Sequence, residues 1–192
     1  MSVELADTKM SPTDTAATGE GAIDEGLYSR QLYVLGFEAM RRMLNSNVLV
    51  IGVRGLGVEV AKNVALAGVR SLTVWDRAPV AAADLSAQFF LNERHIGKPR
   101  DACSVASIAA LNEYVPVRTL EDADDTHKLS TIEQVLSVSV LSQFQVVVLT
   151  DATPEIRLLA GRVAREAKCA LICANVRGLF ASVFCDFGPS FM

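Results

Sequence analysis

The chain has 192 residues, about half of them hydrophobic, and a net charge of −4. This length and composition predict one domain of ordinary size with enough apolar residues for a core. The acidic balance and the lack of a basic block argue against nucleic acid and anionic membranes as partners. The N-terminus lacks the pattern of a secretory signal, so we expect a cytoplasmic and nuclear location.

The order of the elements follows from apolar spacing, turn residues and β-branched runs. Residues 1–26 are polar and aperiodic, which predicts a disordered tail, and residues 27–192 are expected to form the domain. The expected helices are 28–44 with a break near Gly36, 56–67 with Gly68 as its C-cap, a short turn within 83–91, 100–111 after Pro99, 131–141, and 154–167. The expected strands are 47–53, 71–75, 115–119, 145–149, 170–175 and 179–187, and 121–128 is expected to be a surface loop.

Strands that alternate with helices predict an α/β fold, with a mostly parallel sheet covered by helices on both faces. The sequence stops just after an expected strand, so we expect this fold to be incomplete at the C-terminus. The four cysteines lack the spacing of a metal site and are expected to be free. His95 and His127 have no partnering motif nearby, which indicates surface histidines rather than catalytic or metal-binding ones.

A glycine-rich turn over residues 52–57 joins the first expected strand to the next helix. This is the strand–turn–helix opening of a nucleotide-binding α/β unit. Counted from Gly52, the pattern G-x-G-x-x-G places its third glycine at Gly57, with an additional glycine at Gly55. The middle position is Arg54. A glycine there lets phosphate approach the backbone, and an arginine side chain projects into that space.

An acidic residue, Asp76, ends the second expected strand, 24 residues after Gly52. This offset is close to the roughly 20 residues at which an acidic side chain accepts hydrogen bonds from a ribose hydroxyl. An Asx-turn explains an acidic residue at a strand end equally well. Asp76 is therefore a candidate ribose-binding residue on the basis of its spacing.

Five motifs together carry a family resemblance. They are YSRQLYVLG at 28–36, VIGVRGLGVEVAKN at 50–63, DLSAQFFL at 84–91, GKPR at 97–100 and RGLFASVFCDFG at 177–188. As a set they resemble the N-terminal part of eukaryotic ubiquitin-activating enzymes, specifically the inactive adenylation half with its Rossmann-like ThiF/MoeB-type fold. The resemblance implies that two such folds pair, and that only the other half binds ATP and magnesium and adenylates ubiquitin. Ubiquitin then passes to a cysteine of a separate domain, and ubiquitin-conjugating enzymes are partners of the full-length protein.

Departures from the active pattern indicate an inactive site. Active halves resemble Asn-Arg-Gln-Phe where this chain has Ser86-Ala87-Gln88-Phe89, so Ala87 brings no charge to a phosphate. Active halves carry Asp-Asn where Asp151-Ala152 stands here, and the role of Asp151 in holding magnesium stays open. Losing two contacts of about 1.5–3 kcal/mol each weakens binding by roughly two to four orders of magnitude. We expect no cofactor and no metal on this segment.

The degenerate site therefore comprises Gly52, Arg54, Gly55, Gly57 and Asp76 and is expected to be unoccupied. Three cations remain near it in the sequence. Lys62 is one, and Lys98 and Arg100 are either part of the former site or solvated surface charges.

One residue is still expected to serve chemistry. Arg30 matches the family arginine that crosses to the other half and contacts its ATP phosphates. An arginine is suited to this because it presents a permanently charged fork of donors. The alternative for Arg30 is an exposed helix arginine without such a role.

Three functions compete at this point. The first is the inactive adenylation half of a ubiquitin-activating enzyme, which scaffolds the active half and supplies Arg30 in trans. The second is a stand-alone, non-catalytic binding module. The third is the non-catalytic subunit of a SUMO- or NEDD8-activating enzyme.

Overall fold

The computed structural model describes residues 25–123 and 129–189. The chain forms two compact units, residues 1–41 and residues 42–192. The described part of the first unit is most of helix α1 (Glu25–Leu44), which begins three residues before the expected start. Gly36, with φ 80° and ψ 163°, breaks this helix, as the sequence predicts. The expected disordered tail lies outside the described residues, except for residues 25 and 26, which are helical.

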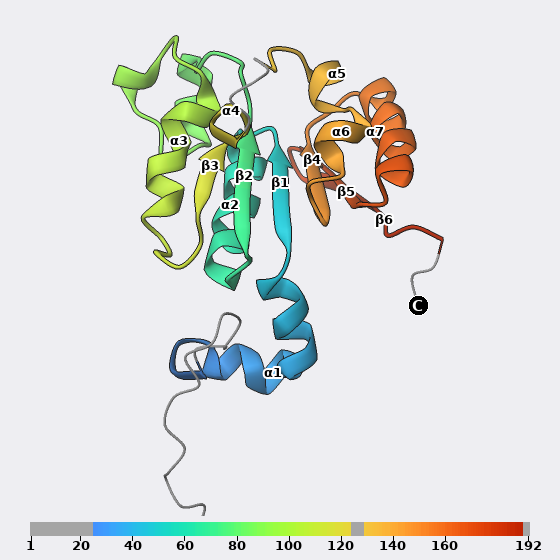
Figure 1. Ribbon diagram of the computed structural model, residues 1–192. Coiled ribbons are helices and arrows are strands. Elements are labelled where there is room, and N and C mark those ends of the chain that lie inside the picture. The colour runs from blue at the N-terminus through green and yellow to red at the C-terminus, as the bar shows by residue number, and fades with distance from the viewer. Residues whose placement is uncertain (1–24, 124–128, 190–192) are drawn as a thin grey trace, which may run out of the picture. The chain divides into compact units, whose positions relative to one another are not determined.

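The second unit is built on a six-stranded sheet in the order β3-β2-β1-β4-β5-β6 (Figure 1). Five strands are parallel, and only the pair β5 and β6 is antiparallel, so the expected mostly parallel α/β fold is confirmed. The strands are β1 (Asn47–Ile51), β2 (Ser71–Trp75), β3 (Val117–Thr119), β4 (Val146–Thr150), β5 (Ala170–Arg177) and β6 (Phe180–Asp186).

Helices connect these strands. They are α2 (Gly55–Ala67), α3 (Arg100–Ala109), α4 (Leu120–Ala123), α5 (Ile132–Val135), α6 (Val138–Leu141) and α7 (Pro154–Ala167), with 3-10 turns η1 (Ala82–Ser86) and η2 (Glu93–His95). No helix among the described residues combines the length and the apolar character needed to cross a membrane.

The core lies on both faces of the sheet. Along β1, Leu49 and Ile51 point into a cluster shared with α6 and α7, whereas Val48 and Val50 point into a cluster shared with α2 and α3. Successive side chains of a strand face opposite sides, so this division follows from the backbone geometry. A parallel strand buried on both faces needs a continuous apolar run, and residues 48–51 supply one.

Capping residues next to each helix determine where α2 ends and where α7 begins. Thr153 caps α7 by accepting from the Ile156 N–H, and Pro154 occupies the first turn, where its missing N–H costs nothing. Gly68 ends α2 with φ 83°, the left-handed conformation predicted for it.

Two local predictions are wrong. The expected single helix over residues 131–141 is two short helices, because Leu136 has the non-helical angles φ −78° and ψ 61°. The expected surface loop begins instead with helix α4, which places the buried Leu120 in the core, and residues 124–128 lie outside the described part of the chain.

Candidate functional site

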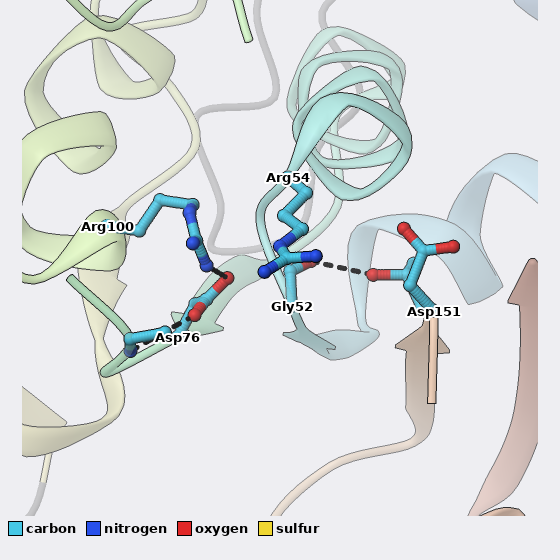
Figure 2. Close-up of a pocket in the computed structure, with 7 residues that line it drawn as sticks. Gly52, Arg54, Asp76, Arg100 and Asp151 are labelled. Atoms are coloured by element: carbon cyan, nitrogen blue, oxygen red, sulfur yellow. Dashed lines mark hydrogen bonds and ion pairs between the residues drawn. The ribbon is translucent and has the colours of Figure 1, made fainter. Parts of the chain in front are cut away.

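The glycine turn lies where the strand order changes direction. From β1 the chain moves outward to β2 and β3, and then crosses to β4 on the other side of β1. In open α/β sheets, ligands bind at this switch point, beyond the carboxyl ends of the strands. A cavity of about 190 Å³ lies there, lined by Gly52, Arg54, Asp76, Ala78, Arg100, Thr150 and Asp151 (Figure 2).

Two of the turn glycines are required by packing. Gly52 has φ 88°, and a Cβ on it would lie 2.7 Å from Thr150 Oγ1. A Cβ on Gly57 would lie 1.8 Å from the Gly52 carbonyl oxygen, which also accepts a hydrogen bond from Thr150 Oγ1 at 2.9 Å. The positive φ of Gly52 and its contact with the end of β4, together with the close approach of α2 to the turn at Gly57, therefore explain both glycines without any bound phosphate.

Gly55 opens α2 and faces the segment that follows η1. A Cβ on Gly55 would meet the Cβ of Ala87 at 3.1 Å and its carbonyl oxygen at 3.2 Å. The position at which the resemblance expects a phosphate-binding arginine thus holds a methyl group packed toward the turn.

Arg54 is the N-cap residue of α2 and lines the cavity (Figure 2). Its side chain is 62 % exposed, and its Nε lies 3.9 Å from Asp84 Oδ1. This long, exposed ion pair contributes little to stability. The side chain therefore lies at the cavity wall, at the position where the glycine of an intact motif leaves space.

Asp76 does not present a free carboxylate. Its Oδ2 accepts from the Val53 N–H at 2.9 Å and from Arg100 Nη1 at 2.6 Å, and its Oδ1 accepts from the Ala78 N–H at 3.3 Å. The contact with the Val53 N–H holds the end of β2 against the start of the glycine turn, and the contact with Arg100 joins it to the start of α3. A ribose hydroxyl would have to compete with these donors.

Arg100 is buried, with 2 % of its surface exposed, so the alternative of a solvated surface charge is wrong. Besides Asp76, it binds Asp84 through Nε at 3.2 Å and Nη2 at 3.0 Å. Burial alone would lower the pKa of the Arg100 guanidinium. The charges and hydrogen bonds of Asp76 and Asp84 outweigh burial and raise this pKa above its ordinary value. Because Asp84 comes from η1, Arg100 joins that turn to the end of β2. By contrast, Lys98 is exposed, and Lys62 lies over the Phe89 ring and pairs with Glu59.

Asp84 is held as a carboxylate. Burial raises its pKa, but the hydrogen bond from the Ala81 N–H and the charge and hydrogen bonds of Arg100 outweigh this and lower the pKa below its ordinary value. In the sequence, Asp84 is recognisable only as the first residue of the motif DLSAQFFL. Its pairing with Arg100, 16 residues later, has no local signal.

Two further polar groups support the site from behind. Asp101 is fully buried and accepts from the Asp76 N–H at 3.0 Å and the Ala102 N–H at 2.7 Å, and burial raises its pKa. Gln88, also fully buried, donates to Ser104 Oγ at 2.8 Å and accepts from the Phe90 N–H. Sequence reasoning missed these supporting roles, because a buried polar side chain is recognisable only once its partners are in place.

Asp151 lies at the cavity rim with φ 52°. Its Oδ1 accepts from Arg177 Nη1 at 3.3 Å and from the Val176 N–H at 3.4 Å. Its carboxylate therefore contacts the end of β5. Among the described residues, no group of three or more His, Cys, Asp or Glu side chains is arranged to hold a metal ion.

The remaining candidates lie elsewhere. Arg30 is an exposed residue of α1 in the first unit. His95 belongs to η2, where its Nδ1 accepts from the Asn92 N–H, and His127 lies outside the described residues.

The fold and the turn define a class of protein. The model of the ThiF family matches residues 28–185, and the chain belongs to this family. Two solved structures share the fold. MccB of E. coli has a TM-score of 0.63 and 16 % sequence identity, and the match covers 78 % of this chain and 44 % of MccB. PaaA has a TM-score of 0.66 and 19 % sequence identity, and the match covers 89 % of this chain and 55 % of PaaA.

Particular members of the family are much more similar in sequence. The chain is 47 % identical over 175 residues to ubiquitin-activating enzyme E1 1 of Schizosaccharomyces pombe, covering 91 % of this chain. It is 46 % identical over 186 residues to human ubiquitin-like modifier-activating enzyme 1, covering 96 %, and 45 % identical over 169 residues to mouse ubiquitin-like modifier-activating enzyme 7, covering 88 %. The similarity lies in the N-terminal region of the ubiquitin-activating enzymes, and the chain spans 16 % of the length of each of these three relatives.

Proposed function

We propose that this chain is the non-catalytic adenylation half of a ubiquitin-activating enzyme. Membership of the ThiF family and 46–47 % identity to ubiquitin-activating enzymes support this assignment. In the proposal, the chain scaffolds a second, active adenylation half, which holds ATP and magnesium and adenylates the C-terminus of ubiquitin. Ubiquitin and, through the full-length protein, ubiquitin-conjugating enzymes are the partners, and the protein works in the cytoplasm and nucleus.

The observation that carries the non-catalytic assignment is the ion pair between Asp76 and Arg100. The carboxylate expected to bind ribose is already bound by an arginine of the same chain, at 2.6 Å and almost fully buried. Around it, the formal charges of Asp76, Asp84, Arg100 and Arg54 cancel. These four groups therefore supply no net positive charge for a triphosphate.

The size of the cavity supports the same conclusion. Its volume of about 190 Å³ lies below the roughly 300–1,000 Å³ of ordinary small-molecule sites. A nucleotide would require Arg54 and Arg100 to move. Moving Arg100 would leave Asp76 and Asp84 without their buried counter-charge.

In the same proposal Arg30 acts outside its own domain. Its exposed position on α1 leaves the guanidinium available to a neighbouring domain. There it would stabilise charge on the ATP phosphates of the active half, as an arginine finger does.

The proposal is tested by ATP–pyrophosphate exchange with ubiquitin. We expect no exchange by the purified chain, with the full-length enzyme as the positive control. Measurable exchange by the chain alone would refute the non-catalytic assignment. Co-purification of the chain with a separately expressed active half tests the scaffold role, and failure to associate would favour the stand-alone binding module.

A second candidate concerns the modifier. The 45 % identity to ubiquitin-like modifier-activating enzyme 7 supports a ubiquitin-like modifier as the alternative substrate. Exchange by the full-length enzyme with ubiquitin, SUMO and NEDD8 in turn separates the candidates. Only the cognate modifier should support exchange.

A further inference from the structure

Gly36 divides helix α1 into a first arm, residues 25–35, and a second arm, residues 37–44. Its backbone angles, φ 80° and ψ 163°, lie in a region that is essentially restricted to glycine. Any residue with a Cβ would be strained in this conformation, because its side chain collides with the backbone. The bend of α1 that is visible in Figure 1 therefore depends on a glycine at this position.

The surroundings of Gly36 do not require a glycine for reasons of space. A Cβ on Gly36 would meet no atom of the described chain within 4 Å. Nor does a glycine by itself break a helix in this protein, since Gly161 lies inside the unbroken helix α7 without a positive φ. The backbone conformation is thus the property of Gly36 that shapes α1.

The two arms of α1 carry different residues. On the second arm, Met40 is fully buried, and Met43 packs against the core cluster that β1 shares with α2 and α3. On the first arm, Tyr28 is buried, but Arg30 is exposed. The second arm is therefore fixed to the core, and the conformation of Gly36 sets the angle at which the first arm, with Arg30, leaves it.

We propose that Gly36 is a positioning residue for Arg30, because its glycine-only conformation orients the first arm so that the guanidinium reaches the ATP phosphates of the active half. This inference rests on the proposed role of Arg30 as an arginine finger.

The spacing along the helix shows how strongly Gly36 can act on Arg30. Arg30 precedes Gly36 by six positions. At 1.5 Å per residue, a change of direction at Gly36 acts over about 9 Å of helix. A misplacement of about 1 Å can cost roughly a hundredfold in rate, so even a small change in the bend should be visible in the kinetics.

The test substitutes Gly36→Ala in the full-length enzyme. Alanine is the best helix former and would meet no obstacle here, so α1 should continue as a regular helix through position 36. We expect ATP–pyrophosphate exchange with ubiquitin to slow at least about tenfold, because the guanidinium is then directed away from the phosphates. The variant with both Gly36→Ala and Arg30→Ala should be no slower than Arg30→Ala alone, since no arginine is left to position.

Two further measurements separate positioning from a general loss of structure. In the 192-residue chain, NMR should show that the Cα chemical shift at position 36 changes from a non-helical to a helical value in Gly36→Ala. In the full-length enzyme, the affinity for ubiquitin should be unchanged. Gly161→Ala, the same substitution inside the unbroken helix α7, is the matched control and should leave exchange at the wild-type rate.

Three results would overturn this inference alone. The first is a wild-type exchange rate for Gly36→Ala while Arg30→Ala is slow. The second is a loss in the double variant beyond that of Arg30→Ala, since Gly36 would then act on something other than the arginine. The third is a Cα shift that stays non-helical, because the bend would then not depend on glycine. A wild-type rate for Arg30→Ala would instead refute the proposed arginine finger, and this inference with it.

Discussion

Removing the positive charge of Arg100 should destabilise the domain strongly. In Arg100→Met the side chain keeps much of its length, but Asp76 and Asp84 lose their shared partner. The three donors lie 2.6 Å, 3.0 Å and 3.2 Å from the two carboxylates, whose side chains are only 9 % and 10 % exposed. Breaking a buried ion pair by removing one partner costs about 3–5 kcal/mol, because it leaves an uncompensated buried charge.

The assay is equilibrium unfolding in urea at neutral pH, followed by circular dichroism. A loss of about 3–5 kcal/mol corresponds to a fall in melting temperature of roughly 6–20 °C for a domain of this size. Arg100→Lys, which keeps the charge but presents no planar fork, should lose less. Adding Asp76→Asn and Asp84→Asn to Arg100→Met should recover part of the loss, because the charges left unpaired are then gone.

The outcome also decides whether the ion pair closes the site. A loss below about 1 kcal/mol would mean that Arg100 behaves as a surface charge, which would refute the reasoning. Failure of the triple variant to recover any stability would also refute it. The destabilisation would then come from lost packing and not from uncompensated charge.

Three further predictions follow from the site. Gly57→Ala places a Cβ 1.8 Å from the Gly52 carbonyl oxygen and should cost at least about 2 kcal/mol in urea unfolding, whereas Gly161→Ala, in open space on α7, should be neutral or stabilising. The pKa of Asp84 is lower in the folded chain than its value of about 3.9 in the unfolded chain. The ionised carboxylate therefore stabilises the fold at pH values above about 3.9, and this contribution to stability is lost as the pH falls through the lower folded pKa. The stability difference between the unmodified chain and Asp84→Asn should therefore shrink in acid, and a constant difference would contradict the pairing. In the full-length enzyme, Arg30→Ala should slow adenylation in pyrophosphate exchange but leave ubiquitin affinity nearly unchanged, and a wild-type rate would remove Arg30 from the mechanism.

The elements that the sequence predicts best are those fixed by neighbouring residues. Strand β2 and helix α7 begin and end where expected, because a turn residue or a cap marks each boundary. The errors arise where distant contacts decide. Residues 121–123 belong to a helix rather than to a loop because the core buries the preceding Leu120, and strand β5 continues to Arg177 because it pairs with β6.

The site shows the same division. The turn glycines and Asp76 are recognisable from spacing along the chain, and the structure brings Gly52, Arg54 and Asp76 to one cavity. The partner of Asp76 is not recognisable in this way, because Arg100 lies 24 residues beyond it and a surface role is an equally good interpretation of its sequence. Burial decides between the two interpretations, and burial depends on the whole fold.

The pairing of Asp76 with Arg100 has a thermodynamic consequence. A domain that binds a nucleotide is stabilised by its ligand through mass action, by about 2.7 kcal/mol at one hundred times the dissociation constant. Here the positive charge that pairs with Asp76 belongs to Arg100 of the same polypeptide. The fold, and not the concentration of a ligand in solution, therefore decides how often this pair forms. We therefore expect the melting temperature of this domain to be insensitive to added ATP, so that the domain keeps its structure when the cellular energy charge falls.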